Sequence, residues 1–182
     1  MNTKLRFNPV ILISLILFGF ISGSCEKDEI KIKNSDLIVL FQYEYMNWAW
    51  GFSHAGWFID NKGNVQKYVK PENWISDSSG YYDYAGLISN YNQTIALIGQ
   101  VDLEELNEKS ALIVGTLNGQ LSEIECHGAD MGSLNYYCYS WDPEKKKFKR
   151  QLLSSGGDCE QINTTPEAIE LTEYLKGINH LF

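Results

Sequence analysis

The chain contains few of the residues from which proteins build metal centres. It has 3 histidines and 4 cysteines among 182 residues, and no two cysteines stand three positions apart. Zinc sites usually take their ligands from closely spaced cysteine and histidine pairs. Cys126, His127 and Asp130 form a short cluster, but neighbouring residues on a strand point to opposite faces, so Cys126 and His127 would chelate poorly. We therefore expect no metal site and no cofactor.

Positive charge is also scarce. Lysine and arginine total 15 against 23 aspartates and glutamates, which gives a formal net charge of −8. Such a charge repels the phosphates of nucleic acid, so we expect no nucleic-acid partner. The one basic run, Lys145 to Lys147 with Lys149 and Arg150, is interpreted as a solvated hairpin tip that discourages pairing at a sheet edge.

No apolar run is long enough to cross a bilayer, which takes about 20 residues. The longest stretch of mainly apolar residues covers 12 residues, from Val10 to Ile21, with Ser14 within it, and it follows Lys4 and Arg6 with no acidic residue before it. A basic start, a short apolar segment and small residues at the end are the parts of a secretory signal peptide. We therefore predict a signal peptide over residues 1–24.

The end of this segment carries a resemblance. Ser22-Gly23-Ser24-Cys25 resembles the lipobox of bacterial lipoproteins, although Ser22 stands where that motif usually has leucine. The resemblance implies that Cys25 receives a diacylglycerol thioether and becomes the new N-terminus, and that the partner of this end of the chain is the membrane. Acyl chains anchor a protein because each buried CH₂ contributes about 0.8 kcal/mol.

The next residues resemble a second signal. Lys27, Asp28 and Glu29 follow Cys25-Glu26, and this order is similar to the export signal of surface lipoproteins in Bacteroidota-type bacteria. The resemblance implies an outer-membrane lipoprotein, lipid-anchored and exposed on the cell surface. It covers residues 1–29, and the rest of the chain resembles no family that we can name.

The chain then divides into three parts. Residues 1–24 are the signal peptide, residues 25–35 are the lipidated cysteine with a charged tether, and residues 36–182 are a single globular domain. Loss of Lys4 and Arg6 with the signal leaves 13 basic and 23 acidic residues, a net charge of −10. A domain of this length can bury about two-thirds of its surface.

Hydrophobic periodicity predicts strands and helices in separate blocks. Strands are expected over residues 37–45, 48–60, 65–69, 134–141 and 148–154, and the last two form a hairpin around Asp142-Pro143. Helices are expected over residues 82–92, from the Asp102 cap to Leu117, and from Pro166 onward. Blocks of this kind indicate an α+β fold, a single antiparallel sheet of about five strands with two or three helices packed on one face.

The hairpin also predicts how the cysteines pair. If Trp141 opposes Phe148, Cys138 faces Gln151 and lies away from Cys159. Cys126 and Cys159 then both lie beyond the open end of the hairpin, and we expect a disulfide between them. Cys138 is expected to remain a buried thiol.

Two residues are candidates for a nucleophile. Ser53, in the segment from Gly51 to Gly56, resembles a relaxed nucleophile elbow, but that motif needs a helix after the turn and here a strand continues. Asp158-Cys159 resembles the Asp-Cys pair of secreted cell-wall cysteine peptidases, although the helix pattern begins only at Thr165. A small envelope hydrolase that uses Ser53 or Cys159 is therefore the alternative function.

The strongest binding candidates are aromatic. Trp48, Trp50 and Trp57 lie within ten residues, and aromatic rings stack on flat partners such as sugar rings. In this segment large aromatic residues alternate with alanine, glycine and serine, and such alternation also suits a packed core. Both interpretations therefore stay open here. Our leading interpretation is a non-enzymatic, surface-exposed, lipid-anchored binding module whose ligand is a glycan or a protein.

Overall fold

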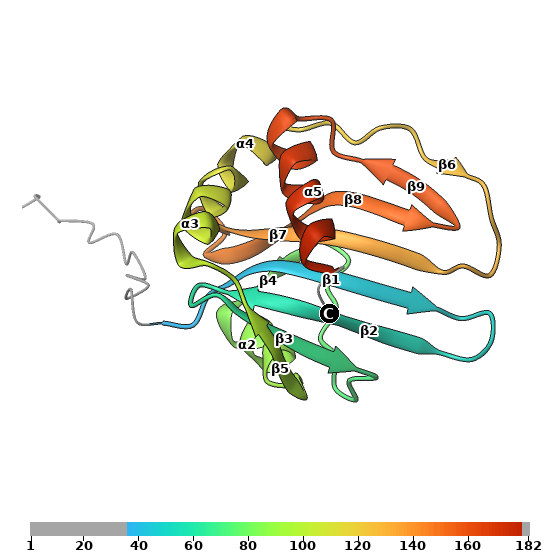
Figure 1. The fold of residues 1–182 in the computed structure, drawn as a ribbon, viewed down its shortest axis with the longest axis horizontal. Coiled ribbons are helices and arrows are strands. Elements are labelled where there is room, and N and C mark those ends of the chain that lie inside the picture. Colours follow the sequence, from blue (N-terminus) through green and yellow to red (C-terminus); the bar gives the residue numbers. More distant parts are fainter. Residues whose placement is uncertain (1–35, 180–182) are drawn as a thin grey trace, which may run out of the picture. The chain divides into compact units, whose positions relative to one another are not determined.

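The structure is a computed structural model, and it describes residues 36–179. These residues form a 9-stranded sheet with the strand order β5-β3-β2-β1-β7-β8-β9-β6, and β4 pairs with β8 (Figure 1). All of these strand pairs are antiparallel. The elements in chain order are β1 (Val39–Asn47), β2 (Ser53–Asp60), β3 (Asn64–Val69), β4 (Tyr81–Tyr82), α2 (Tyr84–Tyr91), β5 (Ala96–Gln100), α3 (Leu103–Ala111), α4 (Ile113–Thr116), β6 (Glu125–Cys126), β7 (Ser133–Asp142), β8 (Lys147–Gly157), β9 (Cys159–Ile162) and α5 (Pro166–Asn179).

The predicted signal peptide, Cys25 and the residues Lys27, Asp28 and Glu29 all lie outside the described residues. Between residues 36 and 179, the structure has no helix with the length and apolar character needed to span a bilayer. The predictions for the N-terminus therefore stay predictions.

The predicted antiparallel α+β sheet is confirmed, but its predicted size is wrong. The five predicted strands correspond to β1, β2, β3, β7 and β8. The four additional strands have at most five residues each, too few for periodicity to distinguish them from loops. The predicted start of the second strand is also wrong, because β2 begins at Ser53. Trp48 and Trp50 lie in a tight turn where Gly51 has a φ of +103°, a left-handed value that favours glycine.

Helices cover both faces of the sheet, which corrects the prediction that they pack on one face. Helices α3, α4 and α5 cover one face, where Phe41 and Ile59 contribute to the core together with Leu171. Helix α2 lies on the other face, where its Leu87 packs in a cluster with Phe58 (Figure 1). Both faces of the central strands are therefore buried.

The predicted hairpin and disulfide are confirmed. Trp141 opposes Phe148 and Cys138 opposes Gln151 across β7 and β8. Cys126 and Cys159 face each other across β6 and β9 and form a disulfide that links residues 33 positions apart. Cys138 is a free, buried thiol, and its burial raises its pKa to about 11.

The helix starts follow the predicted capping residues. Asp102 accepts hydrogen bonds from the backbone N–H groups of Glu104 and Glu105, at 2.9 and 3.0 Å, and so caps α3. The predicted helix to Leu117 is divided, however. It is interrupted at Leu112, whose N–H bonds back to Lys109 and Ser110, and resumes as the short helix α4.

Candidate functional site

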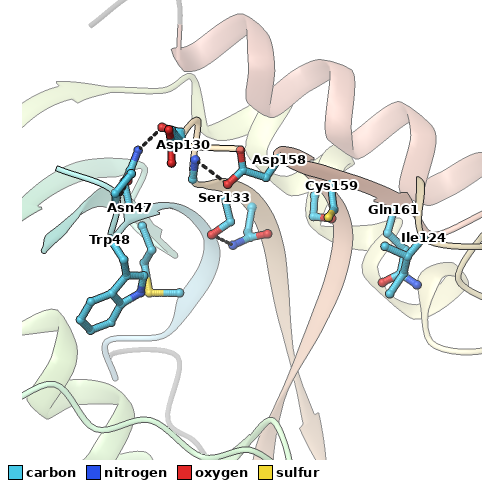
Figure 2. A pocket seen from close by; sticks show the side chains of 13 residues that line it. Asn47, Trp48, Ile124, Asp130, Ser133, Asp158, Cys159 and Gln161 are labelled. Carbon is cyan, nitrogen blue, oxygen red and sulfur yellow. Dashed lines mark hydrogen bonds between the residues drawn. The ribbon is translucent and has the colours of Figure 1, made fainter. Parts of the chain in front are cut away.

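A cleft of about 570 Å³ opens at the end of the sheet where β1 leads into the β1–β2 turn. The end of β1, the start of β7 and the first residues of β9 all contribute to it. Figure 2 shows Trp48 at one side of this cleft and Ile124 and Gln161 at the other. Its lining residues are Met46, Asn47, Trp48, Ala49, Ile124, Asp130, Gly132, Ser133, Asn135, Ser155, Asp158, Cys159 and Gln161.

Two large aromatic side chains are exposed beside the cleft. Trp48 is 72% exposed and Trp50 is 87% exposed, values that are unusual for the most hydrophobic rings in a protein. The Trp48 ring packs on Phe52, with the ring centroids 4.3 Å apart and the planes tilted by 35°. Phe52 therefore supports one face of Trp48 and leaves much of the indole in solvent.

Asn47 fixes the turn that carries Trp48. Its side-chain oxygen accepts a hydrogen bond from the Ala49 backbone N–H at 2.8 Å. Its side-chain nitrogen donates to the Tyr45 hydroxyl at 3.0 Å and to the Asp130 carbonyl oxygen at 2.9 Å. These hydrogen bonds join the β1–β2 turn to the loop before β7, and they hold Trp48 at the cleft.

The three predicted tryptophans lie in three different environments. Trp48 lines the cleft, whereas Trp50 lines a neighbouring hollow of about 370 Å³ together with Ser53 and Lys70. Trp57 is 4% exposed and packs in the core below α5, where its indole N–H donates to the Asn179 side chain at 3.2 Å. Of the two interpretations left open for Trp57, the structure shows the core position, because the strand turns its ring toward the helices.

The floor of the cleft is polar. Ser133 and Asn135 extend from β7, Ser155 from β8 and Gln161 from β9. Asn135 lies directly opposite Ser155 across the two strands, and its amide donates to the Ser133 hydroxyl at 3.4 Å. Asn135 is 7% exposed, so its polar group is almost enclosed by the protein and faces the cleft. A ligand there meets amide and hydroxyl groups in a row.

Asp158 shapes the back of the cleft. Its carboxylate accepts hydrogen bonds from the backbone N–H groups of Met131 at 2.8 Å and of Gly132 at 3.1 Å, and Figure 2 shows the second of these. Gly132 has a φ of +75°, and a Cβ there would lie 2.3 Å from the Met46 carbonyl oxygen. Only glycine fits this close approach of the loop to β1. Cys159, which follows Asp158 and forms the disulfide with Cys126, also lines the cleft.

A buried polar network continues inward from the cleft floor. Glu44 of β1 is directly opposite Asn135, so both side chains leave the same face of the sheet. One Glu44 oxygen lies 3.1 Å from Nε2 of His54, and the other lies 3.8 Å from the Arg150 guanidinium. Glu44 and His54 are 2% and 3% exposed, so this is a buried cluster of ionisable groups.

Neutral polar side chains complete the network. The Gln42 amide donates to the Tyr68 hydroxyl at 2.9 Å, and its oxygen accepts a hydrogen bond from the Tyr139 hydroxyl. Burial, and after it the negative charge of Glu44, raises the pKa of Tyr68 well above its ordinary value. Burial likewise raises the pKa of Tyr139. These hydroxyls therefore remain protonated donors at neutral pH.

Sequence reasoning missed this network. Gln42 and Glu44 alternate with the apolar residues of β1, which predicts a solvent-facing side. Arg150 belongs to the basic run interpreted as a solvated tip, but its side chain is 18% exposed and lies over the Tyr137 ring at 4.3 Å. The signal that was available is the density of tyrosines on β7, which can surround buried polar groups as well as apolar ones.

The candidate nucleophiles do not lie in a catalytic arrangement. The sulfur of Cys159 is bonded to Cys126, so it is not a thiol. Ser53 is adjacent to His54 on β2, and neighbours on a strand point to opposite faces. His54 is directed instead toward Glu44. Across residues 36–179, no group of three or more His, Cys, Asp or Glu side chains is arranged to hold a metal ion.

Comparisons with models of protein families, with curated proteins and with solved structures find no match to this chain. The function must therefore be inferred from the cleft, the aromatic side chains beside it and the network beneath it.

Proposed function

We propose that the cleft beside Trp48 binds a glycan. The observation that carries this proposal is an indole that is 72% exposed, supported from behind by Phe52, at the rim of a cleft whose floor carries amide and hydroxyl side chains. One face of a sugar ring is made of C–H groups and stacks on an aromatic ring, while its hydroxyls seek amide and hydroxyl partners. Trp48 supplies the first kind of contact, and Asn135 with Gln161 supplies the second.

The size of the cleft favours a glycan over a protein ligand. A cleft of about 570 Å³ falls in the range of about 300–1,000 Å³ that is usual for small-ligand sites. A stable protein partner would need about 800 Å² of surface on each side, with an apolar centre. The cleft instead combines the apolar rim at Trp48 and Ile124 with polar side chains from Ser133, Asn135 and Ser155 on its floor, which suits a ligand with both C–H faces and hydroxyls.

We further propose that the protein presents this cleft from the cell surface on a lipid anchor. The support is the resemblance of Ser22-Gly23-Ser24-Cys25 to a lipobox and of Lys27-Asp28-Glu29 to a surface-export signal. Labelling of cells with a fatty acid should mark the wild-type chain and leave Cys25→Ala unmarked. Replacement of Lys27, Asp28 and Glu29 by alanine should give a lipidated chain that external protease no longer degrades.

The binding proposal is tested with the full chain in the membranes of expressing cells. Washed membranes are incubated with a panel of soluble polysaccharides, and retention is compared with membranes that carry Trp48→Ala. We expect at least one polysaccharide to be retained by the wild type and released by the variant. Retention of none, together with capture of a protein through Trp48, would contradict the glycan assignment.

The same experiment distinguishes binding from hydrolysis. The retained polysaccharide is recovered, and its chain length is measured before and after incubation. We expect no shortening, and the same result with Ser53→Ala. Shortening that disappears in Ser53→Ala would establish the hydrolase alternative in place of a binding module, because loss of a covalent nucleophile removes turnover while the fold stays intact.

A further inference from the structure

The charged side chains that line the Trp48 cleft are both acidic. Asp130 and Asp158 contribute carboxylates, and among the lining residues that the structure describes there is no lysine, arginine or histidine (Figure 2). An ionised carboxylate accepts hydrogen bonds but cannot donate them. The hydroxyl groups of a sugar can donate to these two side chains, whereas an acidic group on the sugar meets a charge of its own sign.

The cations near the cleft have other positions or other partners. Lys70 lines the neighbouring hollow together with Trp50, and it does not line the cleft. Arg150 belongs to the network beneath the floor, where its guanidinium lies 3.8 Å from the buried Glu44 carboxylate and its side chain is 18% exposed. Glu44 therefore balances the charge of Arg150, and neither cation is placed to hold an acidic group in the cleft.

The back of the cleft contains one element of the kind that binds anions. Successive backbone N–H groups in a tight loop form concavities that hold phosphates and carboxylates. Here Met131 and Gly132 direct such groups at the Asp158 carboxylate, with distances of 2.8 and 3.1 Å. The protein's own carboxylate therefore uses the backbone donors that an acidic ligand would need.

We infer that the sugar bound in this cleft is uncharged, and that the cleft rejects sugars that carry a carboxylate or a sulfate. The inference rests on the glycan assignment and names the class of glycan that the site accepts. Both carboxylates are fixed in place, Asp158 by the two backbone N–H groups and Asp130 by its carbonyl oxygen, which accepts the hydrogen bond from Asn47 at 2.9 Å. Rejection through like charges at fixed positions is a common source of binding specificity.

The test compares polysaccharides that share a backbone and differ in charge. One pair is polygalacturonate and its methyl ester. The other pair is made from the polysaccharide that wild-type membranes retain, which is lightly carboxymethylated and then compared with the methyl ester of that product. Each is titrated into the full chain in nonionic detergent at about 0.15 M salt, where exposed charges more than about 8 Å apart are largely screened. We expect the acid to bind about tenfold or more weakly than its ester.

Two variants distinguish the charge of the cleft from the charge of the whole chain. Asp130→Asn removes one carboxylate from the cleft, and asparagine tolerates the φ of +77° at this position. The ratio of the acid to the ester dissociation constant should fall about threefold or more in this variant. Glu173→Gln is the matched control, because it removes the same charge from α5, outside the cleft, where the carboxylate is 68% exposed. It should keep the wild-type ratio.

The possible failures give different results. Equal constants for acid and ester, with both lost in Trp48→Ala, would overturn this inference and leave the glycan assignment in place. A wild-type ratio in Asp130→Asn would also overturn it, because the rejection would then not arise in the cleft. Retention of no polysaccharide by the wild type would contradict the glycan assignment, and this inference with it.

Discussion

The two faces of the central strands are both buried, but by different kinds of side chain. Below α5, aliphatic residues such as Leu153 and Leu171 fill the space with almost no exposed area. Below α2, tyrosines and tryptophan enclose Glu44 and His54, which are also almost fully buried. The first face gains stability from removal of apolar surface from water. The second face must supply partners for its buried ionisable groups. Its polar network extends outward to the floor of the cleft.

The largest effect is expected when the polar face loses its central carboxylate. Glu44→Ala leaves Arg150 and His54 without their shared partner, and a buried charge that loses its partner costs about 3–5 kcal/mol of unfolding free energy. Glu44→Gln keeps the volume and one acceptor, so it should cost less. Urea unfolding measures both.

Two controls sharpen this comparison of the faces. Leu171→Ala, on the aliphatic face, should cost about 2–5 kcal/mol through the cavity it leaves. Glu125→Ala, at a carboxylate that is 73% exposed, should change stability very little. If Glu44→Ala were as mild as Glu125→Ala, the polar face would contribute nothing specific to the fold.

The disulfide should give the next largest effect. Cys126→Ala with Cys159→Ala opens a loop of 33 residues, and the chain-entropy model assigns such a loop about 3–4 kcal/mol. The loss of unfolding free energy is measured by urea unfolding of the double variant. It is compared with the losses in Glu44→Ala and Leu171→Ala. Since the bridge borders the cleft, polysaccharide retention should fall as well. Unchanged retention would show that the Trp48 side of the cleft suffices for binding.

Alkaline pH should weaken the tyrosine-rich face. Burial raises the pKa of Tyr68 and Tyr139 above the ordinary value of 10.0. Below pH 10 these hydroxyls are protonated in both states, and their full contribution to stability is present. Above it the unfolded chain releases protons that the folded chain keeps, so the free energy of unfolding falls as the pH rises.

Urea unfolding at a series of pH values above 9 tests this. Tyr139→Phe should show a shallower decline than the wild type, because one raised pKa is gone. Tyr84→Phe, at a tyrosine that is 42% exposed on α2, should keep the wild-type decline. Identical slopes for all three chains would exclude buried tyrosine ionisation as the cause.

Much of the fold was predictable because strong periodicity and local caps decide it. The β7–β8 hairpin has a tight turn after Asp142, and its register alone places Cys138 away from Cys159. Asp102 and Pro166 mark helix starts that depend on neighbouring backbone groups only. These features are set within a few residues, so one sequence is enough to find them.

The rest depends on contacts between distant residues. The short edge strand β5 exists because it meets β3, and nothing in its own five residues shows that. Gln42 and Glu44 appear solvent-facing until the segment that carries Trp74 and α2 covers them. Alternation along the predicted strand places Trp48 and Trp57 on opposite faces, but it does not show which face is exposed. In the structure Trp48 lies in the turn before β2 and is exposed, whereas β2 turns Trp57 into the core.

The central claim is that Trp48, and not aromatic surface in general, forms the binding site. It is tested most directly by calorimetric titration of the best retained oligosaccharide into the full chain in detergent and into Trp48→Ala, Trp48→Phe and Trp50→Ala, each checked for wild-type urea unfolding. We expect Trp48→Ala to weaken binding by more than about 1 kcal/mol, as central aromatic anchors do, with a smaller loss for Trp48→Phe and the smallest for Trp50→Ala. Equal affinity of Trp48→Ala and the wild type, with the fold intact, would contradict the account.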